Sequence, residues 1–165
     1  MHGDLNEGNI IVQKSVSSKA ISNPNDVKDS NLHYDVIGVL DFGDLVHEYL
    51  VYEIGITMAY MMIESKDGLD PLEAGGHVLA GYLHDLDLLD IDRDVTKECV
   101  CARLAQSLLY GAMEHKKNPD NQYCLKTSVR GWPLLRLIWG LSKNTLYEKW
   151  NAIITSYGIA QTLNL

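Results

Sequence analysis

Two short apolar segments, each joined to a polar motif, constrain the fold of this 165-residue chain more than any other feature. The first apolar segment, residues 10–12, follows a polar stretch that begins at His2. The second, residues 36–40, is rich in β-branched side chains and delivers Asp41 at its end. Apolar runs of this kind, bounded by Gly, Asn and Asp, are typical of β-strands. We therefore expect the two segments to pair as a hairpin and to bring their polar motifs together.

The polar motifs carry the groups that phosphoryl transfer needs. Asp4 lies in a Gly-containing loop, Asn9 follows five positions later, and Asp41 opens an Asp-Phe-Gly triplet. A carboxylate that can accept a proton, beside an amide and a carboxylate that can share a hard cation, suits this chemistry. A lone Asp and Asn are more often a local turn, so the indication comes from the pairing of two motifs. They match the H-x-D-x4-N and D-F-G signatures of kinases, with Gly3 in place of arginine.

The paired motifs resemble the aminoglycoside phosphotransferase family of small-molecule kinases, which includes choline and homoserine kinases. The resemblance is carried by H-G-D-L-N-E-G-N-I at residues 2–10 and L-D-F-G-D at residues 40–44, and it extends to about Tyr110. Within the family, the chain resembles in particular those members that phosphorylate hydroxylysine. It implies an α+β fold in which residues 1–165 form the mostly helical C-terminal lobe of a protein-kinase-like fold, with one catalytic β-hairpin.

The same resemblance implies an activity. The chain would take part in a Mg2+-dependent transfer of the γ-phosphate of GTP or ATP. The acceptor would be a hydroxyl of an amino acid or amino alcohol, and 5-hydroxy-L-lysine is the favoured acceptor. The alternatives are a choline- or homoserine-type kinase and a non-catalytic binding lobe. The sequence starts directly before the catalytic loop and shows no Gly-rich loop or strand lysine for phosphates. We therefore expect the nucleotide-binding lobe to be absent and the fragment to be inactive alone.

Each motif residue has a role implied by the resemblance. Asp4 would be the catalytic base that orients the attacking hydroxyl, and His2 would hold the catalytic loop. Asn9 and Asp41 would bind Mg2+, which bridges phosphate oxygens, so both are also the cofactor-binding residues. A single carboxylate and an amide are enough, because Mg2+ keeps several waters when it binds to proteins.

Three acidic residues beyond the second motif are further candidates. Asp44 could contact a substrate ammonium or could cap the turn, and the sequence favours neither. Glu48 is a candidate for the rim of the substrate site. Glu53 stands where related kinases usually have the Asp of an Asp-Leu-Ala triplet, but the triplet here is Glu-Ile-Gly. The longer side chain leaves open whether this position braces the catalytic loop.

The net charge limits the classes of partner, and the cysteine spacing bears on the redox compartment. The formal net charge of −8 and the pI near 5.1 argue against nucleic acid and anionic membranes as partners. A small cationic amino acid and a nucleotide remain as partners. Cys99, Cys101 and Cys124 have no Cys-x-x-Cys spacing and favour reduced thiols. No signal peptide or membrane-length apolar run is seen, so we expect a cytoplasmic protein.

The rest of the chain has the periodicity and the breakers of a helical protein. Asp70 is predicted to cap a helix that has Pro71 at its first position and Glu73 as the capping partner. The predicted helices span residues 49–64, 71–84, 95–115, 133–142 and 145–157, with an exposed hairpin connection over residues 13–35 and a linker over residues 85–94.

Overall fold

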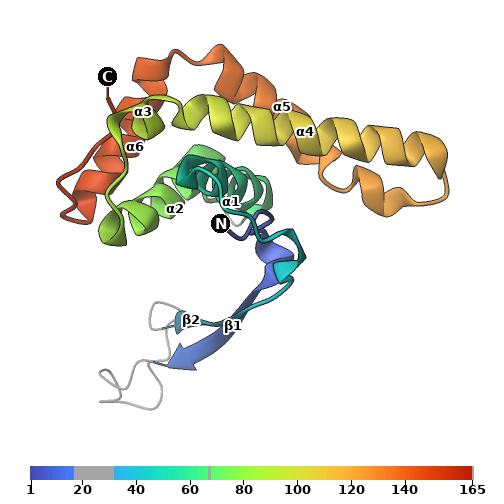
Figure 1. Ribbon diagram of the computed structural model, residues 1–165, viewed down its shortest axis with the longest axis horizontal. Coiled ribbons are helices and arrows are strands. Elements are labelled where there is room, and N and C mark those ends of the chain that lie inside the picture. Colours follow the sequence, from blue (N-terminus) through green and yellow to red (C-terminus); the bar gives the residue numbers. More distant parts are fainter. Residues whose placement is uncertain (17–31, 67, 165) are drawn as a thin grey trace.

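A computed structural model describes residues 1–16, 32–66 and 68–164 of the chain. It confirms the mostly helical α+β class, with one hairpin that projects from a body of helices (Figure 1). The elements in chain order are η1 (Glu7–Asn9), β1 (Ile10–Val16), β2 (Leu32–Val39), η3 (Phe42–Asp44), α1 (Leu50–Glu64), α2 (Pro71–Asp85), α3 (Asp90–Asp94), α4 (Thr96–Lys117), η4 (Gln122–Leu125), α5 (Ser128–Gly140) and α6 (Lys143–Ser156).

The predicted hairpin is confirmed, including its antiparallel sense. Ile10 pairs with Val39 and Val12 pairs with Val36, and the register shift between them leaves Ile37 as the extra residue of a bulge. The backbone N–H of Leu40 donates to the carbonyl of Asn9 at 2.9 Å, so the pairing continues into both polar motifs.

The strands are longer than the sequence predicts. They reach Val16 and Leu32, so both ends of the predicted connection are strand, and its middle, residues 17–31, lies outside the described residues. Main-chain hydrogen bonds alone can lengthen a two-stranded ribbon that is exposed on both faces. Polar residues such as Lys14 and Asp35 therefore extend it without an apolar pattern.

α1 packs against both α2 and α4 and confirms the helix predicted there. Most of its side chains are buried, including Ile54, Met58 and Met62. Gly55 lies at its crossing with α4, where a Cβ atom would meet the Cβ of Cys99 at 2.9 Å and its backbone carbon at 3.0 Å. The absence of a side chain at this position lets the two helices approach closely.

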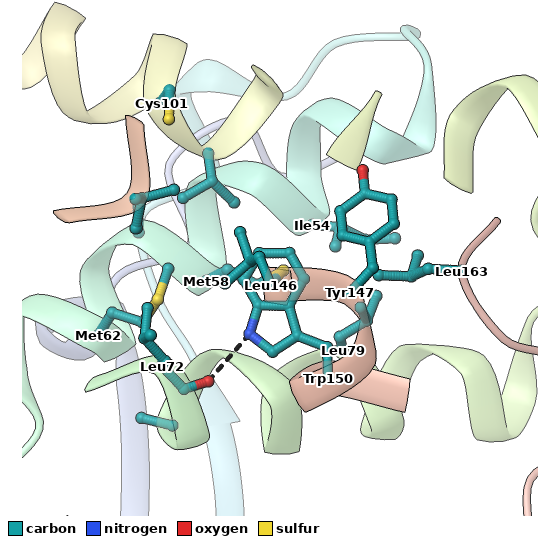
Figure 2. Close-up of a cluster of buried hydrophobic side chains, with 14 of the residues drawn as sticks. Ile54, Met58, Met62, Leu72, Leu79, Cys101, Leu146, Tyr147, Trp150 and Leu163 are labelled. Atoms are coloured by element: carbon teal, nitrogen blue, oxygen red, sulfur yellow. Dashed lines mark hydrogen bonds between the residues drawn. The ribbon is translucent and has the colours of Figure 1, made fainter. Parts of the chain in front are cut away.

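The core is closed by α6, which packs against α2. Trp150 is fully buried, and its indole N–H donates to the carbonyl of Leu72 at 2.9 Å (Figure 2). Tyr147 stacks on Trp150 with 5.9 Å between ring centroids. A buried Trp with its N–H satisfied contributes a large apolar area without a polar penalty.

The start of α2 has the predicted cap at Asp70, whose side chain accepts from the backbone N–H of Leu72 at 2.9 Å. Pro71 occupies the first helical position, as predicted. The predicted capping role of Glu73 is wrong, because its carboxylate pairs with Lys149 at 3.5 Å instead. Lys149 also pairs with Asp70, so a cation from α6 balances both acidic side chains at the start of α2.

Two parts of the helical body depart furthest from the sequence prediction. The linker expected over residues 85–94 contains α3, because Arg93 pairs with Asp90 within that short helix. α5 begins at Ser128 and runs through Pro133, five residues earlier than predicted. Proline lacks the backbone N–H that would donate within the helix, and packing against α4 offsets this loss. Because Gly131 has no side chain, Leu108 of α4 lies only 2.9 Å from the position that a Cβ atom of residue 131 would occupy.

Cys99 and Cys101 lie in α4 as free thiols, and burial raises the pKa of each to about 11. Both thiols are therefore un-ionised at neutral pH. The side chain of Cys124 lies outside the described residues. Within the described ranges, no helix combines the length and the apolar character that crossing a membrane requires.

Candidate active site

His2 ties the two polar motifs together at the base of the hairpin. The ring is nearly buried, with Nε2 at 2.7 Å from the carbonyl of Leu40 and Nδ1 at 3.3 Å from the backbone nitrogen of Asp4. Because a backbone N–H can only donate, Nδ1 is the acceptor and Nε2 carries the proton that Leu40 accepts. The ring also packs against Phe42, with 5.2 Å between centroids. Both nitrogens are engaged, so His2 is placed to hold the loop.

Gly3 brings the catalytic loop against the second motif. Its φ of +87° lies in the left-handed region, and a Cβ there would meet the carbonyl oxygen of Asp44 at 2.5 Å. Its N–H donates to Oε2 of Glu53 at 2.8 Å. Glu53 comes from the first turn of α1 and is buried. The structure therefore answers the question that the sequence left open, because the longer carboxylate does brace the loop.

Both carboxylate oxygens of Asp4 are held in place. Oδ2 accepts from the amide of Asn6 at 3.0 Å, and Oδ1 accepts from Nη2 of Arg103 at 2.5 Å. The main-chain carbonyl of Asp4 accepts from Asn6 at 3.1 Å and from the amide of Asn9 at 2.9 Å. The loop is thus cross-linked by two asparagine amides, which fixes the direction in which the carboxylate points.

Arg103 is a site residue that sequence reasoning missed. It lies on α4, with its guanidinium 5.2 Å from the centre of the Tyr60 ring and Nη2 at 3.2 Å from the Tyr60 hydroxyl. Its Nη1 donates to Gln106 at 2.9 Å. The only signal in the sequence is an arginine directly before Leu104 on a helix with an apolar face. That position indicates a partly buried charge but not its partner.

The electrostatics of the site centre on Asp4. Burial raises the pKa of its carboxyl above the usual range, Arg103 beside it opposes that rise, and the Asp44 and Asp41 carboxylates add to it. A raised pKa makes a carboxylate a stronger proton acceptor. The mutual repulsion of three carboxylates also creates a place where a cation would be stabilised.

Asn9 and Asp41, the residues expected to bind Mg2+, lie at the end of the hairpin that enters the helical body. Because the Asn9 amide nitrogen donates to Asp4, its Oδ1 is oriented away from that bond, and it accepts none from the residues that the structure describes. Asp41 is exposed, with φ 59° and ψ 69°, and among the described residues it alone has positive φ without being glycine. Such backbone strain often accompanies functional residues.

An amide oxygen and a carboxylate oxygen at the end of one hairpin fit a hard cation. Among the residues described, no three His, Cys, Asp or Glu side chains are grouped as a metal set.

The two further substrate candidates are less constrained by the structure. Asp44 ends η3 and is exposed, and it lies close enough to Asp4 to raise the pKa of that carboxyl. Glu48 is exposed in the segment before α1. Neither side chain receives a hydrogen bond from the described part of the chain.

Comparison with known proteins gives one group of relatives. Hydroxylysine kinase of Bos taurus is 36% identical over 157 residues, which cover 94% of this chain and 38% of that protein. Hydroxylysine kinase of Mus musculus is 35% identical over 159 residues, with the same coverage of both proteins. Hydroxylysine kinase of Danio rerio is 33% identical over 150 residues, which cover 90% of this chain and 38% of that protein. No family model matches the chain. No solved structure matches it either.

The chain therefore spans about 38% of the length of the curated relatives it matches. The similarity runs through nearly all of this chain, so it includes the helical body as well as the two polar motifs. The expected resemblance to hydroxylysine kinases in particular is confirmed, because four of them are similar to nearly all of this chain.

Proposed function

We propose that this chain supplies the acceptor- and metal-binding part of a small-molecule kinase. The reaction is Mg2+-dependent transfer of the γ-phosphate of GTP or ATP to a hydroxyl of an amino acid or amino alcohol, with 5-hydroxy-L-lysine as the acceptor. The observation that carries the proposal is the Asp4 carboxylate, held by Asn6 and Arg103 beside Asn9 and Asp41. The names of the relatives support a kinase acting on a small molecule.

In this proposal Asp4 accepts a hydrogen bond from the acceptor hydroxyl and aims its oxygen at the γ-phosphorus. A bond forms between that oxygen and phosphorus, the bond to the β,γ-bridging oxygen breaks, and the nucleoside diphosphate leaves. The hydroxyl proton passes to Asp4, whose raised pKa suits it as acceptor. Mg2+ held by Asn9 and Asp41 would offset the charge on the phosphate oxygens.

Positioning supplies most of the catalytic effect in this chemistry, so the donor must be fixed as firmly as the acceptor. The residues assigned here hold a hydroxyl and a metal, and none of them is assigned to the base or the ribose. We therefore expect residues 1–165 by themselves to show little turnover.

The free thiols fit a reducing compartment such as the cytoplasm.

The test uses a full-length protein that contains this chain. Asp4→Asn should retain nucleotide binding but reduce kcat by roughly 10²–10⁴-fold, which is the typical loss of a positioned base. Asp41→Ala should abolish Mg2+-dependent turnover. Asp35→Asn, an exposed carboxylate on β2, is the matched control and should leave kcat unchanged. Near-normal turnover of Asp4→Asn would exclude Asp4 as the base.

A panel of acceptors separates the proposal from its alternatives. Phosphorylation of 5-hydroxylysine in preference to choline and homoserine would support the proposed acceptor. Preference for choline or homoserine would favour the other branches of the family. Hydroxylysine or nucleotide binding with no turnover by any full-length form would favour a non-catalytic binding protein.

A further inference from the structure

A small polar cavity opens beside Asp4. Its volume is about 220 Å³, and its lining includes Asp4, Glu7, Tyr60, Ile63, Glu64 and Lys126. These residues come from the catalytic loop, the C-terminal half of α1 and the segment between η4 and α5. The volume is below the roughly 300–1,000 Å³ of pockets that hold drug-sized ligands, so it suits a molecule of amino-acid size.

The cavity has charges of both signs, and they are held by weak pairs. Lys126 lies 3.8 Å from Glu7, and Lys66 lies 3.1 Å from Glu64. The two lysine side chains are 60% and 67% exposed, whereas that of Glu64 is 22% exposed. Exposed ion pairs of this kind contribute little to stability. A charged ligand can therefore replace the lysine partner of Glu64 and recruit Lys126 at small cost.

Tyr60 distinguishes between classes of cationic ligand. An aromatic ring at the wall of a pocket can bind a quaternary ammonium through its face. In this chain the guanidinium of Arg103 already lies over the Tyr60 ring, 5.2 Å from its centre. With Lys126 also in the lining, the cavity favours a ligand that carries both an ammonium and a carboxylate over choline-like cations.

Resting on the proposed function, we propose that this cavity is the acceptor subsite and that it recognises a zwitterionic hydroxy amino acid. Glu64 pairs with an ammonium group of the acceptor, Lys126 pairs with its carboxylate, and the hydroxyl lies toward Asp4. Neither Asp44 nor Glu48 lines this cavity. The subsite thus assigns substrate contacts to two positions that the sequence alone did not single out.

The experiment compares two acceptors in the full-length protein: 5-hydroxylysine and 1,5-diamino-2-pentanol, which lacks only the carboxylate. Glu64→Gln should raise KM for both acceptors about tenfold, because a charge-assisted hydrogen bond is lost, with kcat changed little. Lys126→Met should raise KM about tenfold for hydroxylysine alone. The control pair is Glu114→Gln and Lys117→Met, which removes an exposed ion pair at the end of α4 and should change neither constant.

Calorimetric titration of hydroxylysine into the same proteins separates the subsite from the proposed function. Binding that is weakened in Glu64→Gln and in Lys126→Met supports the subsite even where no phosphate is transferred. Wild-type turnover with unchanged KM in both variants would overturn the subsite and leave the kinase proposal standing. A Lys126→Met effect of equal size on both acceptors would overturn the carboxylate assignment. Glu64→Asp, which keeps the charge, should show an intermediate KM, and this repeats the test with a milder substitution.

Discussion

Nη2 of Arg103 lies 2.5 Å from Oδ1 of Asp4, although 99 positions separate the two residues in the sequence. The contact joins the catalytic loop to α4, whose other neighbours include α1 and α5. The direction of the Asp4 carboxylate therefore depends on the packing of the helical body as well as on the loop itself.

Arg103→Gln in the full-length protein is expected to lower kcat about tenfold while KM for nucleotide and acceptor changes little. Without the guanidinium, the Asp4 carboxylate keeps only Asn6 as a side-chain anchor and samples unproductive orientations. Steady-state kinetics give the two constants, and thermal unfolding checks the fold. Arg136→Gln is the control, since it removes an exposed guanidinium that lies over Trp132. An unchanged kcat would mean that Asp4 is positioned without Arg103.

Gly3→Ala should reduce both stability and turnover. An L-residue with φ near +87° costs about 1–2 kcal/mol in any surroundings, and here the new methyl group would also meet the Asp44 carbonyl. Gly68→Ala is the matched control, because Gly68 has the same φ of +87° and open space around it. Urea unfolding should show the larger loss for Gly3→Ala, and only that variant should lose activity. Equal losses would show that the loop absorbs the methyl group without rearrangement.

Glu53→Ala should destabilise the chain by about 1–3 kcal/mol, because the Gly3 N–H loses a buried acceptor. Glu53→Gln retains an oxygen at the same reach and should lose less. Equilibrium unfolding of both variants gives the difference, and kcat of the full-length protein should follow the same order. If Glu53→Gln were as damaging as Glu53→Ala, the charge rather than the hydrogen bond to Gly3 would be the stabilising element.

The Asp70 cap gives a pH dependence of stability. The hydrogen bond from Lys149 is the largest cause that lowers the pKa of Asp70. A lowered pKa in the folded state stabilises the fold above the unfolded value of roughly 3.9, and this stabilisation is lost as pH falls through the lowered value. Asp70→Asn keeps a capping side chain but not the charge. Its Tm should lie below the wild-type value at pH 7, and the gap should narrow on acidification to about pH 3, which is below the unfolded pKa.

Asp120→Asn serves as the control for that comparison, because Asp120 is exposed in the segment after α4. Its Tm should equal the wild-type value at both pH values. A gap for Asp70→Asn that widened on acidification would contradict the lowered pKa.

The hairpin was predictable because its information is local. β-branched residues on both sides of a polar segment, with Gly and Asn at the turns into the motifs, specify two strands and their order. The cap at Asp70 was predictable for the same reason. The extension of β1 to Val16 was not, since it depends on main-chain pairing and leaves no pattern in exposed side chains.

The partners of Asp4 divide in the same way. Asn6 and Asn9 lie within five positions of it, so a sequence motif can reveal them. Arg103 and Glu53 reach the loop through the way α4 and α1 cross, and a periodic pattern gives the buried face of a helix without its neighbour. Glu64 and Lys126 likewise meet at one cavity from segments that the sequence does not connect.

The close crossing at Gly55 makes positions 53, 55 and 103 one epistatic unit. An alanine at 55 would meet the backbone of Cys99 and push α4 outward, and Arg103 would move with that helix away from Asp4. A shorter carboxylate at 53 would no longer reach Gly3 from the same helix. An evolutionary path from Glu-Ile-Gly to Asp-Leu-Ala must therefore change helix spacing and loop bracing together, because each single step passes through a weakened catalytic loop.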